Sequence, residues 1–137
     1  GLDVLTDERL IEPYNIFEGR KLSARTIAIR PHLVYHLRNP YTPSWGESYV
    51  AIVARMVEAM NELAAKTEGG DVVIVTHQLP IWITHRHLKG LKLAHNPQKR
   101  RCALSSITTF EVTKDGLVEV GYLNPAESLL AVDKGAV

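Results

Sequence analysis

The sequence is poor in cysteine, and its positive and negative charges nearly cancel. The one cysteine, Cys102, has no partner for a disulfide within the chain and no activating basic neighbour that the sequence identifies, so we expect a buried, inert thiol in a reducing compartment. The 16 Lys and Arg residues against 15 Asp and Glu leave a formal net charge of +1. No strong basic field therefore favours nucleic acid or a membrane surface.

Long apolar runs, repeats and low-complexity linkers are also missing. No apolar stretch approaches the roughly 18 residues of a membrane span, and no signal peptide is evident. These absences predict a cytoplasmic protein with residues 1–137 as a single domain, and 45% apolar residues are enough to build a core. The chain begins with Gly1 and not Met, and Leu2, Val4 and Leu5 predict a short strand; a preceding segment and a tag remnant both fit this beginning.

Apolar residues at three- and four-residue spacing predict a long helix from about Gly46 to Lys66. Ser44 and Glu47 stand three apart before it, which is the spacing of a capping box, and this explains Glu47 without a functional role. Gly69 and Gly70 follow, where the helix is expected to end. The residues predicted to face the core are Val53, Met56, Val57 and Met60.

The run from Asp71 to Val75 contains four successive β-branched residues and no polar alternation, which predicts an interior parallel strand covered on both faces. Pro80 is expected to open a helix that ends near Leu88, so that a strand, a histidine, a turn and a helix follow one another. Further on, residues 105–112 and 117–123 predict two paired strands joined by a turn. The sequence thus indicates an α/β fold with a mostly parallel sheet.

His77 lies where the predicted strand passes into the helix, which is where open α/β sheets bind ligands. The helix N-terminus beside it offers backbone N–H groups to an anion such as phosphate. The alternative to a ligand-binding role is a structural histidine, whose side chain hydrogen-bonds to the backbone at the end of a strand. Glu12 follows Leu10 and Ile11 and is a candidate proton donor, although a solvated carboxylate is the commoner case and Glu18 is equally eligible.

Other polar residues have structural interpretations. His32 and His36 stand four apart within a short predicted helix, but no third ligand accompanies them, so a surface pair is favoured over a metal site. His85 and His87 are two apart and are expected to point in different directions on their helix. The basic run 99–101 is interpreted as a solvated loop and not as a nucleic-acid patch.

The order of these segments resembles the histidine phosphatase superfamily, also called the phosphoglycerate mutase family. The segments that carry the resemblance lie within residues 3–112 and read DERLIE, FEG, PSWGES, VVIVTHQLPI and ALSSITTF. The resemblance implies a three-layer fold whose mostly parallel sheet is flanked by helices. It also implies that His77 is the histidine that helps to bind the phosphoryl group, with Gln78 beside it, and that Glu12 is the acid that protonates the leaving oxygen.

The sequence departs from the family pattern in three places. The family's nucleophile lies in an N-terminal Arg-His-Gly motif, and no such motif occurs in these residues, so the resemblance implies a C-terminal part that lacks the opening strands. The usual His-Gly is His77-Gln78 here. The segment EPYNIFEG, which begins with Glu12, lacks the glycine that usually follows the acid.

The expected function is hydrolysis of a phosphoric ester through a phosphohistidine in an intact parent protein, with a small phosphorylated substrate and no cofactor or metal. A non-catalytic phosphate-binding or regulatory module is the alternative from another class. A mutase-type phosphotransferase is disfavoured, because only a modest loop separates Glu12 from Gly46. The 137 residues alone are expected to be inactive and to self-associate through an exposed sheet edge.

Overall fold

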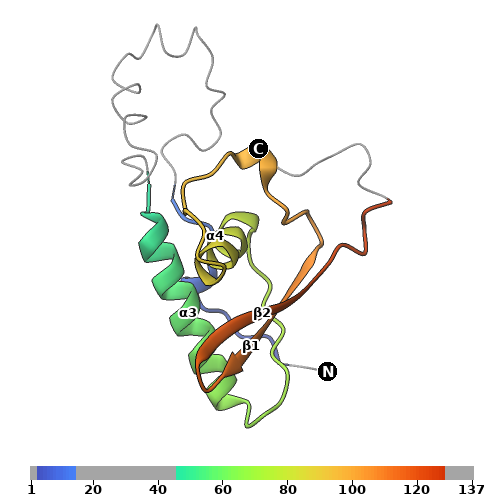
Figure 1. The fold of residues 1–137 in the computed structure, drawn as a ribbon. Helices are drawn as coiled ribbons and strands as arrows, with labels where there is room; N and C mark the ends of the chain where they lie inside the picture. Colours follow the sequence, from blue (N-terminus) through green and yellow to red (C-terminus); the bar gives the residue numbers. More distant parts are fainter. Residues whose placement is uncertain (1–2, 15–45, 129–137) are drawn as a thin grey trace, which may run out of the picture.

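The computed structural model describes residues 3–14 and 46–128, which form two α-helices, a two-stranded antiparallel sheet and two short 3-10 helices (Figure 1). The strands form one hairpin that lies against the helices. Helices and strands are both present, but among the described residues the sheet is a single antiparallel hairpin, so the predicted three-layer, mostly parallel sheet is not seen here. The elements are η1 (Glu8–Leu10), α3 (Tyr49–Lys66), α4 (Gln78–Leu88), η2 (Pro97–Lys99), β1 (Ile107–Thr113) and β2 (Gly116–Leu123).

Helix α3 confirms the long helix of the sequence, but its N-terminal cap differs from the predicted one. Ser48 is the cap, and its hydroxyl accepts a hydrogen bond of 3.2 Å from the backbone N–H of Ala51. Glu47 instead forms an ion pair of 2.9 Å with Arg55. The prediction that Glu47 belongs to a capping box is therefore wrong. Ser44, its predicted partner, lies outside the described residues.

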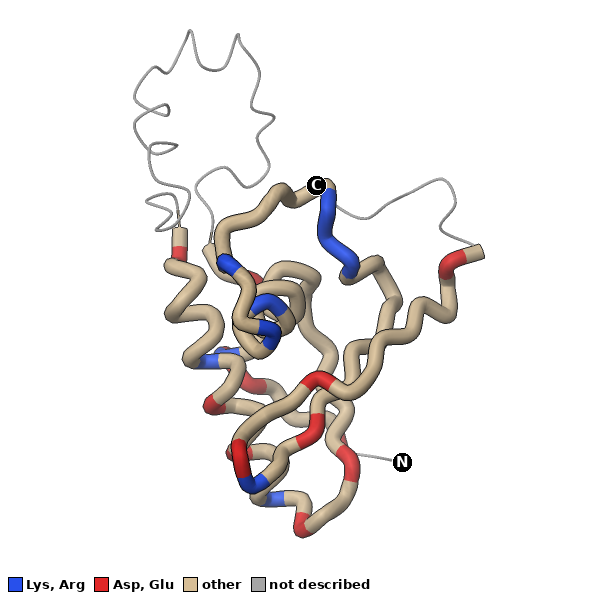
Figure 2. The backbone as a smooth tube through the Cα atoms, viewed as in Figure 1, with Lys and Arg blue, Asp and Glu red and all other residues tan. Residues whose placement is uncertain are grey.

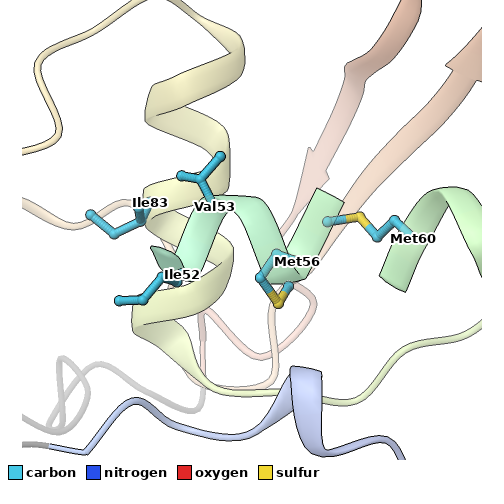
Figure 3. Close-up of a cluster of buried hydrophobic side chains, with 5 residues drawn as sticks. All are labelled: Ile52, Val53, Met56, Met60 and Ile83. Atoms are coloured by element: carbon cyan, nitrogen blue, oxygen red, sulfur yellow. The ribbon is translucent and has the colours of Figure 1, made fainter. Parts of the chain in front are cut away.

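The core lies between α3 and α4 (Figure 3), and α3 also packs against η1. Ile52 of α3 and Ile83 of α4 are completely buried at its centre. Three of the four predicted core-facing residues of α3 are buried as expected, whereas Val57 is only partly buried at the margin of the cluster. The five buried residues of the cluster are Ile52, Val53, Met56, Met60 and Ile83.

The interior strand predicted at residues 71–75 is absent from the described structure. Residues 71–77 are assigned to no strand, and Val73 and Val75 are 83% and 89% exposed. A parallel strand needs hydrogen-bonding neighbours, and none of the described residues supplies one here. The short strand expected at the start is likewise absent, because Val4 and Leu5 are exposed and η1 follows them.

The hairpin confirms the two strands predicted near the end of the chain. Strand β1 pairs with β2 in antiparallel register, with Thr113 opposite Gly116, so that Lys114 and Asp115 form a two-residue turn. Gly116 has a φ of +121°, which a side chain would disfavour. Phe110 and other partly buried residues of this hairpin pack against the core, so the hairpin is part of the same packed unit as the helices.

Helix α4 begins at Gln78, two residues earlier than predicted, so Pro80 is its third residue. The proline fits there because the first-turn N–H groups of a helix have no partner within the helix. The early start makes His77 the N-cap residue, which matters for the site described below. Within the described ranges, no helix combines the length and the apolar character needed to cross a membrane.

Candidate functional site

The segment before Glu12 is fixed on α3 by charged contacts. Arg9 forms ion pairs with Asp7, Glu58 and Glu62 at N–O distances of 2.6, 3.1 and 2.7 Å. The hydrogen bonds from Arg9 lower the pKa of Asp7 to about 2, so this carboxylate keeps its charge near neutral pH. Arg55 of α3 donates to the backbone carbonyl of Arg9. These contacts fix the position of the backbone that leads to residues 10–12.

A second contact joins this segment to the residues that precede α4. The hydroxyl of Thr76 donates to the backbone carbonyl of Leu10. As a result, Nδ1 of His77 lies 3.6 Å from Oε2 of Glu12. This distance is too long for a hydrogen bond, and both side chains are partly exposed, at 56% and 40%. The structure therefore brings together the two residues that the sequence singled out, although they are 65 positions apart.

His77 stands at the N-terminus of α4 without using its side chain as a cap. It has extended backbone dihedrals, with φ −97° and ψ 162°, and its imidazole makes no capping hydrogen bond. The N–H groups of Gln78 and Leu79 lie in the first turn, where a helix has no internal acceptor for them. An exposed imidazole and the first-turn backbone N–H groups thus stand together at the positive end of a helix dipole, which favours an anion.

The side chain of Gln78 is engaged with the loop that precedes β1. Its Nε2 donates to the carbonyl oxygen of Cys102, and its Oε1 accepts from Nη1 of Arg100 at 3.2 Å. Gln78 therefore ties this loop to the start of α4. Its backbone N–H lies at the first position of the helix, where a helix has no internal acceptor for it.

Arg100, which contacts Gln78, is a further residue beside the site that the sequence did not single out. Its Nε lies 3.0 Å from Nε2 of His95, whose Nδ1 lies 2.8 Å from the carbonyl of Leu93. This pattern places the proton of His95 on Nδ1 and leaves Nε2 as an acceptor. Burial lowers the pKa of His95, which favours the same neutral form. Burial also lowers the pKa of Arg100, although the nearby charge of Glu12 opposes this.

The neighbouring Arg101 clamps the loop to β2. Its Nη2 lies 2.5 Å from Oε1 of Glu119, and its guanidinium stacks 4.5 Å above the ring of Tyr122. Nδ1 of His85 donates to the other oxygen of Glu119, whose side chain is only 5% exposed. Burial raises the pKa of Glu119, but the hydrogen bonds and the charges of Arg101 and His85 together lower it by more, so the net pKa is below its ordinary value.

We predict that Glu119→Gln lowers the free energy of unfolding at pH 7 by about 1–3 kcal/mol, because Arg101 and His85 lose their charged acceptor. The folded state depresses the pKa of Glu119, so its contribution is present above the unfolded pKa near 4.5 and is lost as the pH falls through the folded pKa. Denaturant unfolding from pH 7 to pH 3 should therefore show the two proteins converging in acid. Glu111→Gln, at an exposed position of β1, is the control and should change little. A difference that is constant with pH would contradict the ionic role.

His85, His87 and Cys102 have the surroundings that their structural interpretations predict. His85 is buried and stacks on Trp82 with 4.8 Å between ring centroids, whereas His87 is exposed, so the two point in different directions as predicted. Cys102 is buried, and burial raises the pKa of its thiol. Within residues 3–14 and 46–128, no group of three His, Cys, Asp or Glu side chains is arranged to hold a metal ion. Three further candidates, Glu18, His32 and His36, lie outside those ranges.

Comparison with known proteins places the chain in a family. The family model of the histidine phosphatase superfamily (branch 1) matches residues 1–124, and the chain belongs to this superfamily. Its members have an α/β fold, which agrees with the helices and strands observed here. The predicted resemblance is thereby confirmed.

Two curated relatives come from Mycobacterium tuberculosis. The chain is 47% identical over 126 residues to "Uncharacterized protein Rv0525" of strain ATCC 25618 / H37Rv, which covers 91% of this chain and 62% of that protein. It is 46% identical over 126 residues to "Uncharacterized protein MT0547" of strain CDC 1551 / Oshkosh, with the same coverage. The chain therefore spans less than two thirds of the length of these relatives.

Proposed function

We propose that the full-length protein is a phosphoric ester hydrolase that acts through a phosphohistidine intermediate. In this proposal His77 helps to bind the phosphoryl group and Glu12 protonates the leaving oxygen. The observation that carries the proposal is the approach of Glu12 to His77 at the N-terminus of α4, in a chain that belongs to the histidine phosphatase superfamily.

Besides an attacking group, phosphoryl transfer needs dispersed positive charge on the phosphoryl oxygens. His77 supplies an imidazole N–H, and the first turn of α4 supplies backbone N–H groups from Gln78 and Leu79. These donors belong to one rigid helix end, so they keep their positions while charge shifts to the leaving group. Binding of the phosphate by such preorganised donors is what we assign to this chain.

The second task is to deliver a proton to the leaving oxygen as its bond to phosphorus breaks. Glu12 lies beside the same phosphate position, and the 3.6 Å distance leaves its carboxyl outside hydrogen-bonding range of His77. In the protonated form, Glu12 donates to the leaving alkoxide and becomes a carboxylate. It is then suited to take a proton from the water that hydrolyses the phosphohistidine.

The attacking group of the proposal is a histidine of the Arg-His-Gly type, which the 137 residues do not contain. Its imidazole forms a nitrogen–phosphorus bond while the ester oxygen leaves, and water then breaks that bond and releases phosphate. The proposal places this residue elsewhere in the full-length protein. It also places Asp71–Val75 as an interior strand of a three-layer, mostly parallel sheet, which would cover the exposed Val73 and Val75.

The test is to incubate the full-length protein with aryl and alkyl phosphate monoesters, to follow release of inorganic phosphate, and to quench in acid and in alkali. We expect turnover and a phosphoprotein that is labile in acid and stable in alkali, as a phosphoramidate is. Binding of phosphate without turnover would support the non-catalytic module instead. Transfer to an added alcohol in preference to water would support a mutase-type phosphotransferase.

The sheet part of the proposal has its own measurement. If strands of the same protein cover residues 71–75, the full-length protein sediments as a monomer at micromolar concentration and the amide hydrogens of this segment exchange slowly. Concentration-dependent dimerisation with fast exchange in the monomer would instead support self-association through this segment.

A further inference from the structure

The position of the His77 imidazole depends on how the backbone around it is fixed. The imidazole is 56% exposed and makes no capping hydrogen bond at the start of α4. Glu12 faces it at 3.6 Å, which is beyond hydrogen-bonding distance. A donor that is to meet a phosphoryl group at a fixed place must therefore be held through the residues on either side of it.

Both chain neighbours of His77 use their side chains to reach distant segments. The hydroxyl of Thr76 donates to the backbone carbonyl of Leu10, which is 66 positions earlier. On the other side, Nε2 of Gln78 donates to the backbone carbonyl of Cys102, which is 24 positions later. The start of α4 is thus fastened to η1 on one side and to the loop before β1 on the other.

The amide of Gln78 is engaged at both ends. While its nitrogen donates to the loop, its oxygen accepts a hydrogen bond of 3.2 Å from Nη1 of Arg100. A donor contact and an acceptor contact together fix the orientation of the amide, and the residue is partly buried. The glycine that is usual after the family's histidine has no side chain and could form neither contact.

The loop that accepts this amide is itself clamped to β2. Figure 2 shows its basic stretch, residues 99–101, on the chain that follows α4. The guanidinium of Arg101 is paired with Glu119 at 2.5 Å. The hydroxyl of Tyr122 donates to the carbonyl of Arg101 and accepts from the backbone N–H of Ala103 at 3.2 Å. A side chain bound to this loop is therefore bound to a fixed point.

We propose that the side chain of Gln78 positions His77 and the first-turn N–H groups of α4 for the phosphoryl group, and that this side chain does not itself bind the phosphate. The inference rests on the proposed function for the role of His77. The amide of Gln78 contacts protein atoms at both ends, whereas its backbone N–H stays at the first position of the helix. A small displacement of a preorganised donor is enough to slow a reaction strongly.

The test is made on the full-length protein with Gln78→Met, which keeps the length of the side chain and loses both polar contacts. The backbone N–H of residue 78 is retained, so the variant reports on the side chain alone. Gln98→Met is the matched control, because Gln98 is an exposed glutamine of η2. Circular dichroism reports the fold of each variant, and Gln78→Ala replaces Gln78→Met if that variant does not fold.

With an aryl phosphate as substrate, we expect Gln78→Met to lower kcat about 10- to 100-fold, as misplacement of a catalytic group does, with little change in KM. Gln98→Met should leave both constants unchanged. A rise in KM at unchanged kcat would show that the amide of Gln78 binds the phosphate directly and would overturn the positioning role. Unchanged turnover in Gln78→Met would overturn it as well.

A second variant loosens the loop without touching the site. Tyr122→Phe loses the hydroxyl that binds Arg101 and Ala103 but keeps the ring beneath the guanidinium. If Gln78 transmits the position of the loop, Tyr122→Phe lowers kcat in the wild-type background and has no further effect when Gln78→Met is already present. Additive effects of the two substitutions on kcat would contradict this link.

Nuclear magnetic resonance of the His77 imidazole separates this inference from the proposed function, since it requires no turnover. We expect Tyr122→Phe to shift the imidazole resonances in the wild-type background and to leave them unshifted when Gln78→Met is already present. That result in a protein without turnover would support the positioning role and contradict only the hydrolase. Resonances that do not respond to Tyr122→Phe in either background would overturn the positioning role even in an active enzyme.

Discussion

His77→Ala is expected to lower the turnover of phosphate esters by the full-length protein by about 100-fold or more, because the substitution removes one preorganised donor to the transferring phosphoryl group. The loss should appear in kcat as well as in kcat/KM, since the negative charge on the phosphoryl oxygens changes on the way to the transition state. Steady-state kinetics with an aryl phosphate measure both constants.

Stability should be nearly unchanged in this variant. The side chain of His77 is 56% exposed and makes no capping hydrogen bond, so its removal creates no cavity and leaves no orphaned group. His87→Ala is the control, because it removes an exposed histidine from the same helix, ten residues from the site. If both variants retain full turnover, or if both lose it together with their thermal stability, the assignment of His77 is wrong.

The elements that the sequence predicted well are those whose signals are local. The spacing of Met56 and Met60 fixes a helical face over a few turns, and the two-residue turn before Gly116 fixes the hairpin register. The run Asp71–Val75 is different, because its apolar residues indicate burial without saying which strands pair with it. Pairing depends on distant residues, and the described part of the chain leaves Val73 and Val75 exposed.

The same distinction explains what could be predicted of the site. His77 was found because its place between an apolar run and a helix is visible in one stretch of sequence. The basic run 99–101 looks like an ordinary solvated loop, and no local pattern distinguishes its members. The two arginines differ only in their distant partners. Arg100 contacts the neutral Gln78, which is 22 positions away, whereas Arg101 contacts the carboxylate of Glu119, which is 18 positions away.

The largest effect on stability is expected from a charge placed between α3 and the elements that cover it. Ala59 is completely buried on α3, whereas Ala54 is exposed on the same helix. Ala59→Asp forces an unpaired carboxylate and extra volume into a packed interior, and should lower the free energy of unfolding by at least about 3 kcal/mol. Ala54→Asp introduces the same side chain into the same helix and should cost only about 0.5 kcal/mol, through helix propensity.

The comparison isolates burial, because residue type, helix and charge change are the same in both variants. Denaturant unfolding at pH 7 measures the two free energies, and the gap between them should narrow toward pH 3, where a buried carboxyl takes up its proton and loses its charge. Ala59→Asp should also lose phosphate binding as it unfolds, because η1, which leads to Glu12, packs on α3. Equal stability of the two variants would show that Ala59 is not enclosed by the core, and the arrangement of α3, α4 and η1 that brings Glu12 to His77 would then be wrong.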